Sequence, residues 1–227
     1  MHSSHILHDF DHAISTLRGE VLSMAGKARH NLELAVQALL ERNMELANAV
    51  IADDDEVDEH ERHIDKLGME ILVRFHPVAT DLRMVISSMK ISMNLERVSD
   101  HATGIAKRAR KMSSRQELQD ATLIEPLYTM ADQLLRDAIS AYSEHDAALG
   151  AGLHARDKEL DRMYKAVGAT FGNRIEQANG RGQDYLHLIL VTRSLERVGD
   201  LAVNIGEDVV FLEAARDLRH ENHRALD

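Results

Sequence analysis

The chain has 227 residues, 44% of them hydrophobic and 29% charged, a composition typical of a globular protein with one or two domains. It contains no cysteine, which excludes disulfide bonds, thiolate metal sites and cysteine nucleophiles. The net charge of −11 argues against a general nucleic-acid-binding protein and favours cations or basic protein surfaces as partners. No apolar run is long enough to span a membrane and residues 1–20 have no signal-peptide core, so we expect a cytoplasmic protein that is not inserted in the membrane.

Helical periodicity in the first half predicts three helices. The first covers residues 8–42, and Asn43 then caps a second helix. His76-Pro77 ends that helix, because the residue before a proline is pushed out of the α region. A third helix runs to about residue 112, and the polar stretch that starts at Ser113 forms a linker.

The second half repeats this plan with three more helices. A fourth helix ends near His145, and Asp146 is placed to cap a fifth. The glycine-containing loop 179–182 follows, and a sixth helix covers residues 183–218. Pro126 lies near the start of the fourth helix and either sets its first turn or kinks it.

Two segments of the first half recur in the second half at nearly constant spacing. At a shift of 103, the matching residues are Asn43, Leu46, Val50, Asp54, Glu56 and Asp58 in the first copy and Asp146, Leu149, Leu153, Asp157, Glu159 and Asp161 in the second. Residues 95–100, Leu-Glu-Arg-Val-Ser-Asp, match residues 195–200, Leu-Glu-Arg-Val-Gly-Asp, at a shift of 100. The two shifts differ by three residues, and this difference falls in a loop, so the two matches belong to one repeat. We therefore predict an all-α fold of two tandem antiparallel three-helix bundles related by duplication, residues 1–113 and 114–227.

Each half carries two pairs of acidic residues, each pair four positions apart and on its own helix. The pairs are Asp54 with Asp58 and Glu96 with Asp100, then Asp157 with Asp161 and Glu196 with Asp200. At 3.6 residues per turn, Glu96 and Asp100 are turned by about 100° and about 140° from Leu95 of the buried seam, so they point outward. Carboxylates that converge from two helices suit a hard cation, which predicts a surface metal site in each half.

Other readings of these acids stay open. A solvated charged face accounts for any single pair, and Arg97 and Arg197 could neutralise the acids as salt bridges. A purely structural scaffold would not need matched pairs. A carboxylate-bridged di-metal helical-bundle enzyme is the alternative function, but it would bury its acids and histidines in a bundle core. The outward-facing acids therefore favour a metal-binding adaptor without catalysis.

Two groups of histidines are weaker metal candidates. His60 and His63 lie near Glu56 and Glu59, a pattern typical of di-iron bundles, but the histidines do not repeat in the second half. The chain start also carries His2, His5, His8 and His12. An exposed, frayed terminus accounts for that second group more simply than a metal site does.

The two Leu-Glu-Arg-Val-x-Asp copies, with residues 77–83 (Pro-Val-Ala-Thr-Asp-Leu-Arg) before the first, resemble the PhoU family of accessory regulators of bacterial phosphate-specific transport. The resemblance covers essentially the whole chain. It implies that the eight paired acids hold multinuclear clusters of divalent or trivalent ions, with iron, manganese, magnesium or zinc as candidates. It adds Asn204 as a ninth ligand, whose counterpart Gly104 leaves the first site a ligand short.

The same resemblance implies the function. A member of this family would act without catalysis as a negative regulator of the phosphate regulon and of phosphate uptake. Its partners would be the ATPase subunit of the phosphate ABC transporter and a membrane sensor histidine kinase, with no nucleic acid. A homodimer is one possible assembly.

Overall fold

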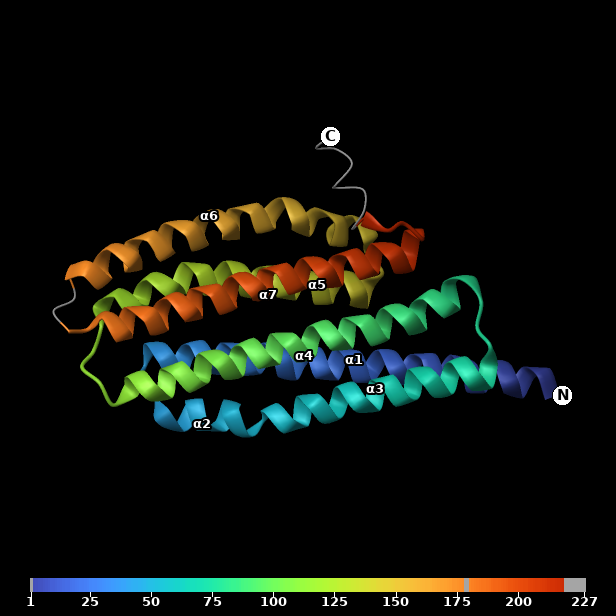
Figure 1. Cartoon of the computed structure of the whole chain (residues 1–227). Coiled ribbons are helices and arrows are strands. Elements are labelled where there is room, and N and C mark those ends of the chain that lie inside the picture. The colour runs from blue at the N-terminus through green and yellow to red at the C-terminus, as the bar shows by residue number, and fades with distance from the viewer. Residues whose placement is uncertain (1, 178–179, 219–227) are drawn as a thin grey trace.

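The computed structural model describes residues 2–177 and 180–218, and the side chains of residues 8–175 and 180–218. Throughout these ranges the regular elements are helices, arranged in two layers (Figure 1). One layer contains α1 (His2–Leu40), α2 (Met44–Ala52), α3 (Asp54–Phe75) and α4 (Ala79–Ser113). The other contains the short 3₁₀ helix η1 (Gln119–Ile124), α5 (Glu125–Glu144), α6 (Ala147–Gln177) and α7 (Gly182–Ala214). The predicted fold of two tandem helical bundles is confirmed.

The prediction of one continuous helix after Asn43 is wrong, because the helix is interrupted at Asp53. The Asp53 N–H closes α2 by bonding the carbonyl of Ala49 at 3.0 Å. Asp54 and the two acidic residues after it then form the first turn of α3, where the helix dipole favours negative charge. The acidic run therefore starts a new helix, whereas the corresponding α6 is unbroken.

Most predicted helix ends are in place. The side chain of Asn43 accepts the N–H of Glu45 at 3.0 Å, and that of Asp146 accepts the N–H of Leu149 at 2.9 Å. Pro126 lies in the first turn of α5 and so starts that helix without kinking it. The linker contains η1, which was not predicted. In the predicted loop 179–182, residue 179 lies outside the described residues, and Gly180 has a positive φ of 92°.

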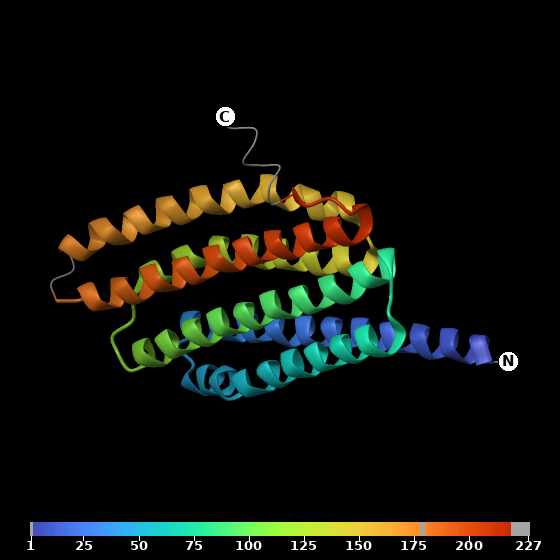
Figure 2. The same ribbon diagram turned by 45° about the vertical axis from the view of Figure 1, so that its right-hand side comes forward.

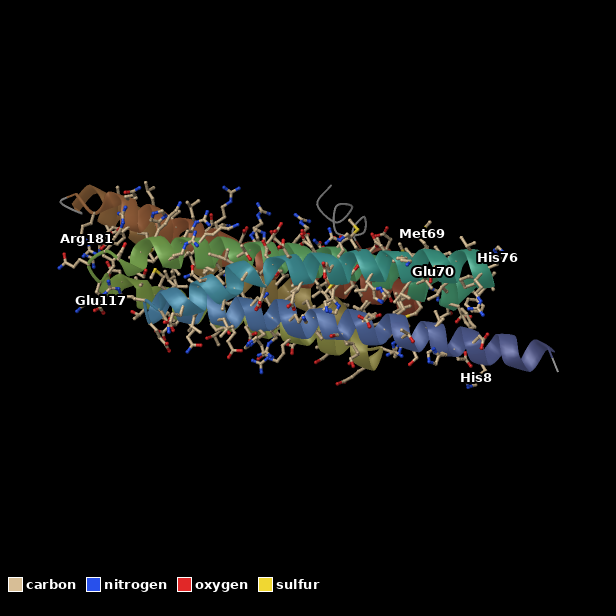
Figure 3. The ribbon with its side chains drawn as sticks, turned by 90° about the horizontal axis from the view of Figure 1, so that it is seen from below. His8, Met69, Glu70, His76, Glu117 and Arg181 are labelled. Carbon is tan, nitrogen blue, oxygen red and sulfur yellow. The ribbon has the colours of Figure 1, made fainter. Side chains whose placement is uncertain are left out.

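Helices α3 and α7 are each followed by a residue with left-handed backbone. Helix α3 stops at His76, whose left-handed backbone (φ 49°) cannot continue an α-helix. Helix α7 ends at Ala214 and not at the predicted residue 218, because Ala215 is also left-handed (φ 54°). Figure 3 shows His76 and His8 at one end of the molecule and Arg181 and Glu117 at the other.

The seams predicted for the third and sixth helices form the core. Of the fourteen seam residues, thirteen are buried and Met112 is half-buried. They are Ile91, Leu95, Val98, Ala102, Ile105, Ala109 and Met112 in α4, and Val191, Leu195, Val198, Ala202, Ile205, Val209 and Leu212 in α7. The two helices lie side by side and antiparallel in the middle of the molecule (Figure 2). One hydrophobic core therefore runs through both repeats.

Polar groups fix how the two layers meet. Asp132, Asp184 and Asp208 belong to α5 and α7 and are only 4–5% exposed. Asp132 accepts from Arg29 of α1 at 2.7 Å, and Asp208 accepts from Lys90 of α4 at 2.5 Å. Asp184 accepts from Arg115 of the linker at 2.8 Å. A buried carboxylate is strongly unfavourable without a partner, so the pairs of Asp132 with Arg29 and of Asp208 with Lys90 hold the two layers in one orientation.

The layers also meet through buried serines of α4. Ser88 shares a hydrogen bond of 2.7 Å with the hydroxyl of Tyr142 in α5. Ser87 donates to the carbonyl of Asp208 in α7 at 3.2 Å. These serines, small residues on the flank of the seam, therefore provide hydrogen bonds between the repeats.

We expect Asp132→Ala to lower the free energy of unfolding by about 2–4 kcal/mol, because charge-assisted hydrogen bonds contribute about 1.5–3 kcal/mol each. Urea unfolding monitored by circular dichroism measures this loss. The matched control is Asp9→Ala, which breaks an ion pair with Arg74 whose side chains are 51% and 67% exposed. That change should cost less than about 1 kcal/mol. Equal losses for the two variants would contradict the role assigned to Asp132.

Candidate functional site

The acids of the first repeat form a group, here called the first quartet, along the boundary between α3 and α4. It consists of Asp54, Asp58, Glu96 and Asp100, all of them half-buried or exposed. The hydroxyl of Thr103 in α4 donates to Asp54 Oδ1 in α3 at 3.0 Å and links the two helices there. The expectation that the motif carboxylates stay accessible to solvent is confirmed for this repeat.

Burial and the closeness of the carboxyl groups raise pKa values in the first quartet. Burial, and then the nearby charges of Asp100, Glu61 and Asp58, raise the pKa of Glu96 to about 7. Burial also raises the pKa of Asp54, against the opposing effect of the hydrogen bond from Thr103. Like charges held close together favour the protonated form, so this group takes up protons where it lacks another cation.

Glu61 is a fifth acid of this group that the sequence reasoning missed. Burial, and then the charges of Asp65 and Asp58, raise the pKa of Glu61. Its position on α3, three residues after Asp58, continues the spacing of four from Asp54 to Asp58 along one helix face. This spacing is visible in the sequence. However, Tyr164 occupies the matching place in the second repeat, so a comparison of acids that recur in both repeats does not find Glu61.

The second quartet is Asp157 and Asp161 of α6 with Glu196 and Asp200 of α7, and all four are half-buried. Burial, and then the charges of Asp200, Asp161 and Glu196, raise the pKa of Asp157 to about 6. Three of the four acids line a cavity of about 470 Å³. Asn204 lines the same cavity, so the structure brings this predicted ligand to the second quartet.

Close helix packing positions Asp157. A Cβ on Gly199 would lie 2.7 Å from Asp157 Oδ1 and 2.2 Å from Leu160 Cδ2, closer than side chains tolerate. The first repeat has Ser99 at this place in the motif, with a buried hydroxyl that has no hydrogen-bond partner among the described residues. Gly199 therefore allows α6 to approach α7 more closely at the second quartet. This is the variable position of the Leu-Glu-Arg-Val-x-Asp motif, so the motif alone gives Gly199 no role.

The two arginines of the motifs behave differently. Arg197 Nη1 donates to Asp200 Oδ2 at 2.8 Å, and its Nε lies 3.4 Å from Glu196 Oε2. The salt-bridge alternative is thus realised in the second quartet. Within the described residues Arg97 forms neither an ion pair nor a hydrogen bond. It lines the cavity of the second quartet, together with His101.

The donor atoms of the quartets suit a hard cation, but they are not assembled as a coordination sphere. Carboxylate and amide oxygens are the ligands that magnesium, manganese and calcium prefer. In the part of the chain that the structure describes, no group of three acidic or histidine side chains is close enough to hold a metal ion as it stands. The side chains would have to converge further on an ion.

The two histidines considered above as metal candidates, His60 and His63, line a different hollow from that of the second quartet. His60 lies 3.4 Å from Glu20 of α1, beside a surface hollow that His63 also lines. His8 and His12 are exposed, in agreement with an exposed chain start. The side chains of His2 and His5 lie outside the described residues.

Comparison with known proteins places both halves in one family. The PhoU domain model matches residues 21–109 and 124–209. A protein of Pseudomonas putida, named "Phosphate-specific transport system accessory protein PhoU homolog", is 34% identical over 217 residues, which cover 95% of this chain and 85% of that protein. A relative of the same name from Caulobacter vibrioides is 30% identical over 92% of this chain and 91% of its own length.

Solved structures agree with this placement. The crystal structure of PhoU from Pseudomonas aeruginosa has a TM-score of 0.88 and 31% identity, and covers 91% of this chain and 100% of that one. A regulatory protein PhoU from Streptococcus pneumoniae has the same fold, with a TM-score of 0.84, 24% identity and 92% and 98% of the two chains covered. Among the described helices, none is both long and apolar enough to cross a membrane. The chain belongs to the PhoU family.

Proposed function

We propose that this protein regulates phosphate transport as a metal-binding adaptor and is not an enzyme. The observation that carries the proposal is that both halves match the PhoU domain, while a relative aligned over 95% of this chain is named an accessory protein of phosphate-specific transport. The position of the acids supports binding over catalysis. They lie at the solvent-accessible boundary between helices, whereas a carboxylate-bridged di-metal enzyme holds its metal ligands in the bundle core.

The regulation that we propose is negative. When phosphate is plentiful, the protein would restrain phosphate uptake and keep the phosphate regulon repressed. It would do so in the cytoplasm, by contact with the ATPase subunit of the phosphate ABC transporter and with a membrane sensor histidine kinase. The family resemblance supplies these two partners, and the net charge of −11 favours basic surfaces on them.

Metal binding at the quartets is the second part of the proposal. Two unit charges 4 Å apart repel by roughly 4 kcal/mol at an effective dielectric constant of 20. The raised pKa values of Glu96 and Asp157 are signs of this crowding, added to the effect of burial. A divalent or trivalent ion would relieve the repulsion in the way that a proton does, with a larger charge. Iron, manganese, magnesium and zinc are the candidate ions.

Metal should stabilise the folded protein through the quartets. We expect magnesium, manganese, iron or zinc to raise the melting temperature progressively as more metal is supplied, because an ion that binds only the folded state stabilises it. In Glu196→Ala/Asp200→Ala the contribution of the second quartet should be lost, while circular dichroism still reports a helical fold. The control is Asp55→Ala/Glu59→Ala, an exposed acid pair of α3 with the same spacing outside the quartet, which should respond like the unmodified protein. A melting temperature that none of the four metals changes would leave the metal proposal without support.

The contribution of Glu96 to the stability of the metal-free protein should fall as the pH rises. The folded protein holds a proton on Glu96 up to a pKa of about 7, whereas the ordinary value is 4.5, so protonation stabilises the fold at low pH. This stabilisation is fully present below about pH 4.5 and is lost as the pH rises through 7. We expect Glu96→Gln to raise the melting temperature at pH 8 and to flatten its decline between pH 5 and pH 8. Glu59→Gln, an exposed control on α3, should leave the profile unchanged, and equal profiles for both variants would count against crowding at Glu96.

Loss of the protein should switch on phosphate-starvation genes in phosphate-rich medium, because the proposed repression is removed. Transcript levels of the phosphate regulon in a deletion strain measure this. The control is the same strain complemented with the intact gene, which should restore repression. Normal repression in the deletion strain would contradict the regulatory role.

A further inference from the structure

Two histidines, His101 and His154, line the cavity of the second quartet. His154 belongs to α6 and His101 to α4, and the same cavity is lined by Asp157, Asp161 and Asp200. Helix α7 lies between α6 and α4 in both ribbon views and packs against each of them (Figures 1 and 2). The cavity therefore combines side chains from three helices and from both repeats.

Two close contacts between α6 and α7 fix the position of His154. A Cβ on Gly206 would lie 2.7 Å from the carbonyl oxygen of Gly150. A Cβ on Gly199 would lie 2.7 Å from Asp157 Oδ1. His154 lies between these two contacts on α6, three residues before Asp157, and residues three apart share one face of a helix. Its side chain is exposed, so it can turn toward the acids.

His101 approaches the same acids from the first repeat. It directly follows Asp100 of the first quartet in the sequence, but it lines the cavity of the second. Burial and nearby arginines lower the pKa of His101, whereas the charge of Asp200 raises it. The imidazole of His101 and the carboxylate of Asp200 therefore lie near enough for their charges to interact across the contact between α4 and α7.

The first quartet offers a cation a different set of ligand atoms. Its four members and Glu61 are all carboxylic acids, so their ligand atoms are oxygens. At the shift of 103 that relates α3 to α6, the residue that matches His154 is Ile51, which has no ligand atom in its side chain. Oxygen ligands suit magnesium, calcium and manganese, whereas imidazole suits zinc, iron, nickel and copper. The two quartets therefore differ in the metal that their side chains favour.

Arg197 makes nitrogen ligands more useful at the second quartet. It donates to Asp200 Oδ2 at 2.8 Å and lies 3.4 Å from Glu196 Oε2, so it occupies oxygens that a metal ion could otherwise use. Two imidazoles with one oxygen each from Asp157 and Asp200 would supply the four ligands that zinc usually takes. Histidine also adds ligands without adding negative charge to a group of acids that already repel one another.

We propose that His101 and His154 are nitrogen ligands of the cation that binds at the second quartet. They give this site a preference for zinc or ferrous iron over magnesium, while the first quartet keeps the preference of an all-oxygen site for magnesium or manganese. The inference rests on the proposed metal binding and adds which residues select the metal. Because His101 belongs to α4, the second site is complete only when the two repeats are packed together.

The test is thermal unfolding of the full chain at increasing concentrations of zinc and, separately, of magnesium. In His101→Gln/His154→Gln, the zinc concentration needed for a given rise in melting temperature should increase at least about tenfold, because even residues that only support a metal ligand cost about 10–100-fold in affinity when removed. The response to magnesium should be unchanged, which also shows that the variant folds. The matched control is His60→Gln/His63→Gln, which removes two histidines of a different hollow and should keep the full response to zinc. A loss in this control variant, with none in His101→Gln/His154→Gln, would overturn the proposal.

A combined variant tests whether the histidines and the acids hold the same ion. Adding the two histidine changes to Glu196→Ala/Asp200→Ala should reduce the response to zinc no further than the acid changes alone, because both sets of changes remove one bound ion. Additive losses would show that the histidines bind zinc apart from the quartet and would overturn the proposal. If neither metal changes the melting temperature of the unmodified protein, this inference and the metal proposal fail together. If both metals stabilise it but His101→Gln/His154→Gln responds to zinc like the control, this inference alone fails.

Discussion

The contact between α4 and α7 is the constraint on which the rest of the structure depends. Each of these helices is the seam of its own bundle, and together they join the two cores into one. Asp208 lies buried beside this contact and pairs with Lys90 across it, while Asp132 and Asp184 pair with cations elsewhere along the boundary. Because an unpartnered carboxylate would be costly at these places, the pairs of Asp132 with Arg29 and of Asp208 with Lys90 each oppose sliding or rotation of one repeat against the other. This fixed arrangement keeps Arg97 beside the second quartet.

The same packing holds the acids of each quartet together against their repulsion. Leu195 and Val198 are buried in the seam of α7, and Glu196 and Asp200 follow on the adjoining face of the helix. The helix cannot turn these acids away without exposing its seam. Burial of the apolar stripe therefore fixes the carboxylates at the α6–α7 boundary, and Gly199 allows α6 to come close enough for Asp157 to join them. Protons, cations and arginine are the means by which such a group lowers its charge.

The features that the sequence predicted correctly are those with a local or periodic cause. The caps at Asn43 and Asp146, the stop at His76 and the paired acids all follow from short-range rules of helix geometry. The features it missed depend on contacts between helices. Gly199 matters only because Leu160 packs against it, and Arg97 acquires its surroundings only when the second repeat is placed beside the first. No spacing within one helix carries that information.

The two quartets occupy matching places in the two repeats, but they differ in charge. The first contains a fifth acid, Glu61, and Thr103 donates its one described hydrogen bond to Asp54. The second replaces that acid with Tyr164, adds the neutral amide of Asn204 and carries its own counter-ion in Arg197. A site with more negative charge attracts a cation more strongly, whereas a site that already holds an arginine must displace it before an ion can use the same oxygens. The two repeats thus share a fold and a motif, but they offer cations two chemically different environments.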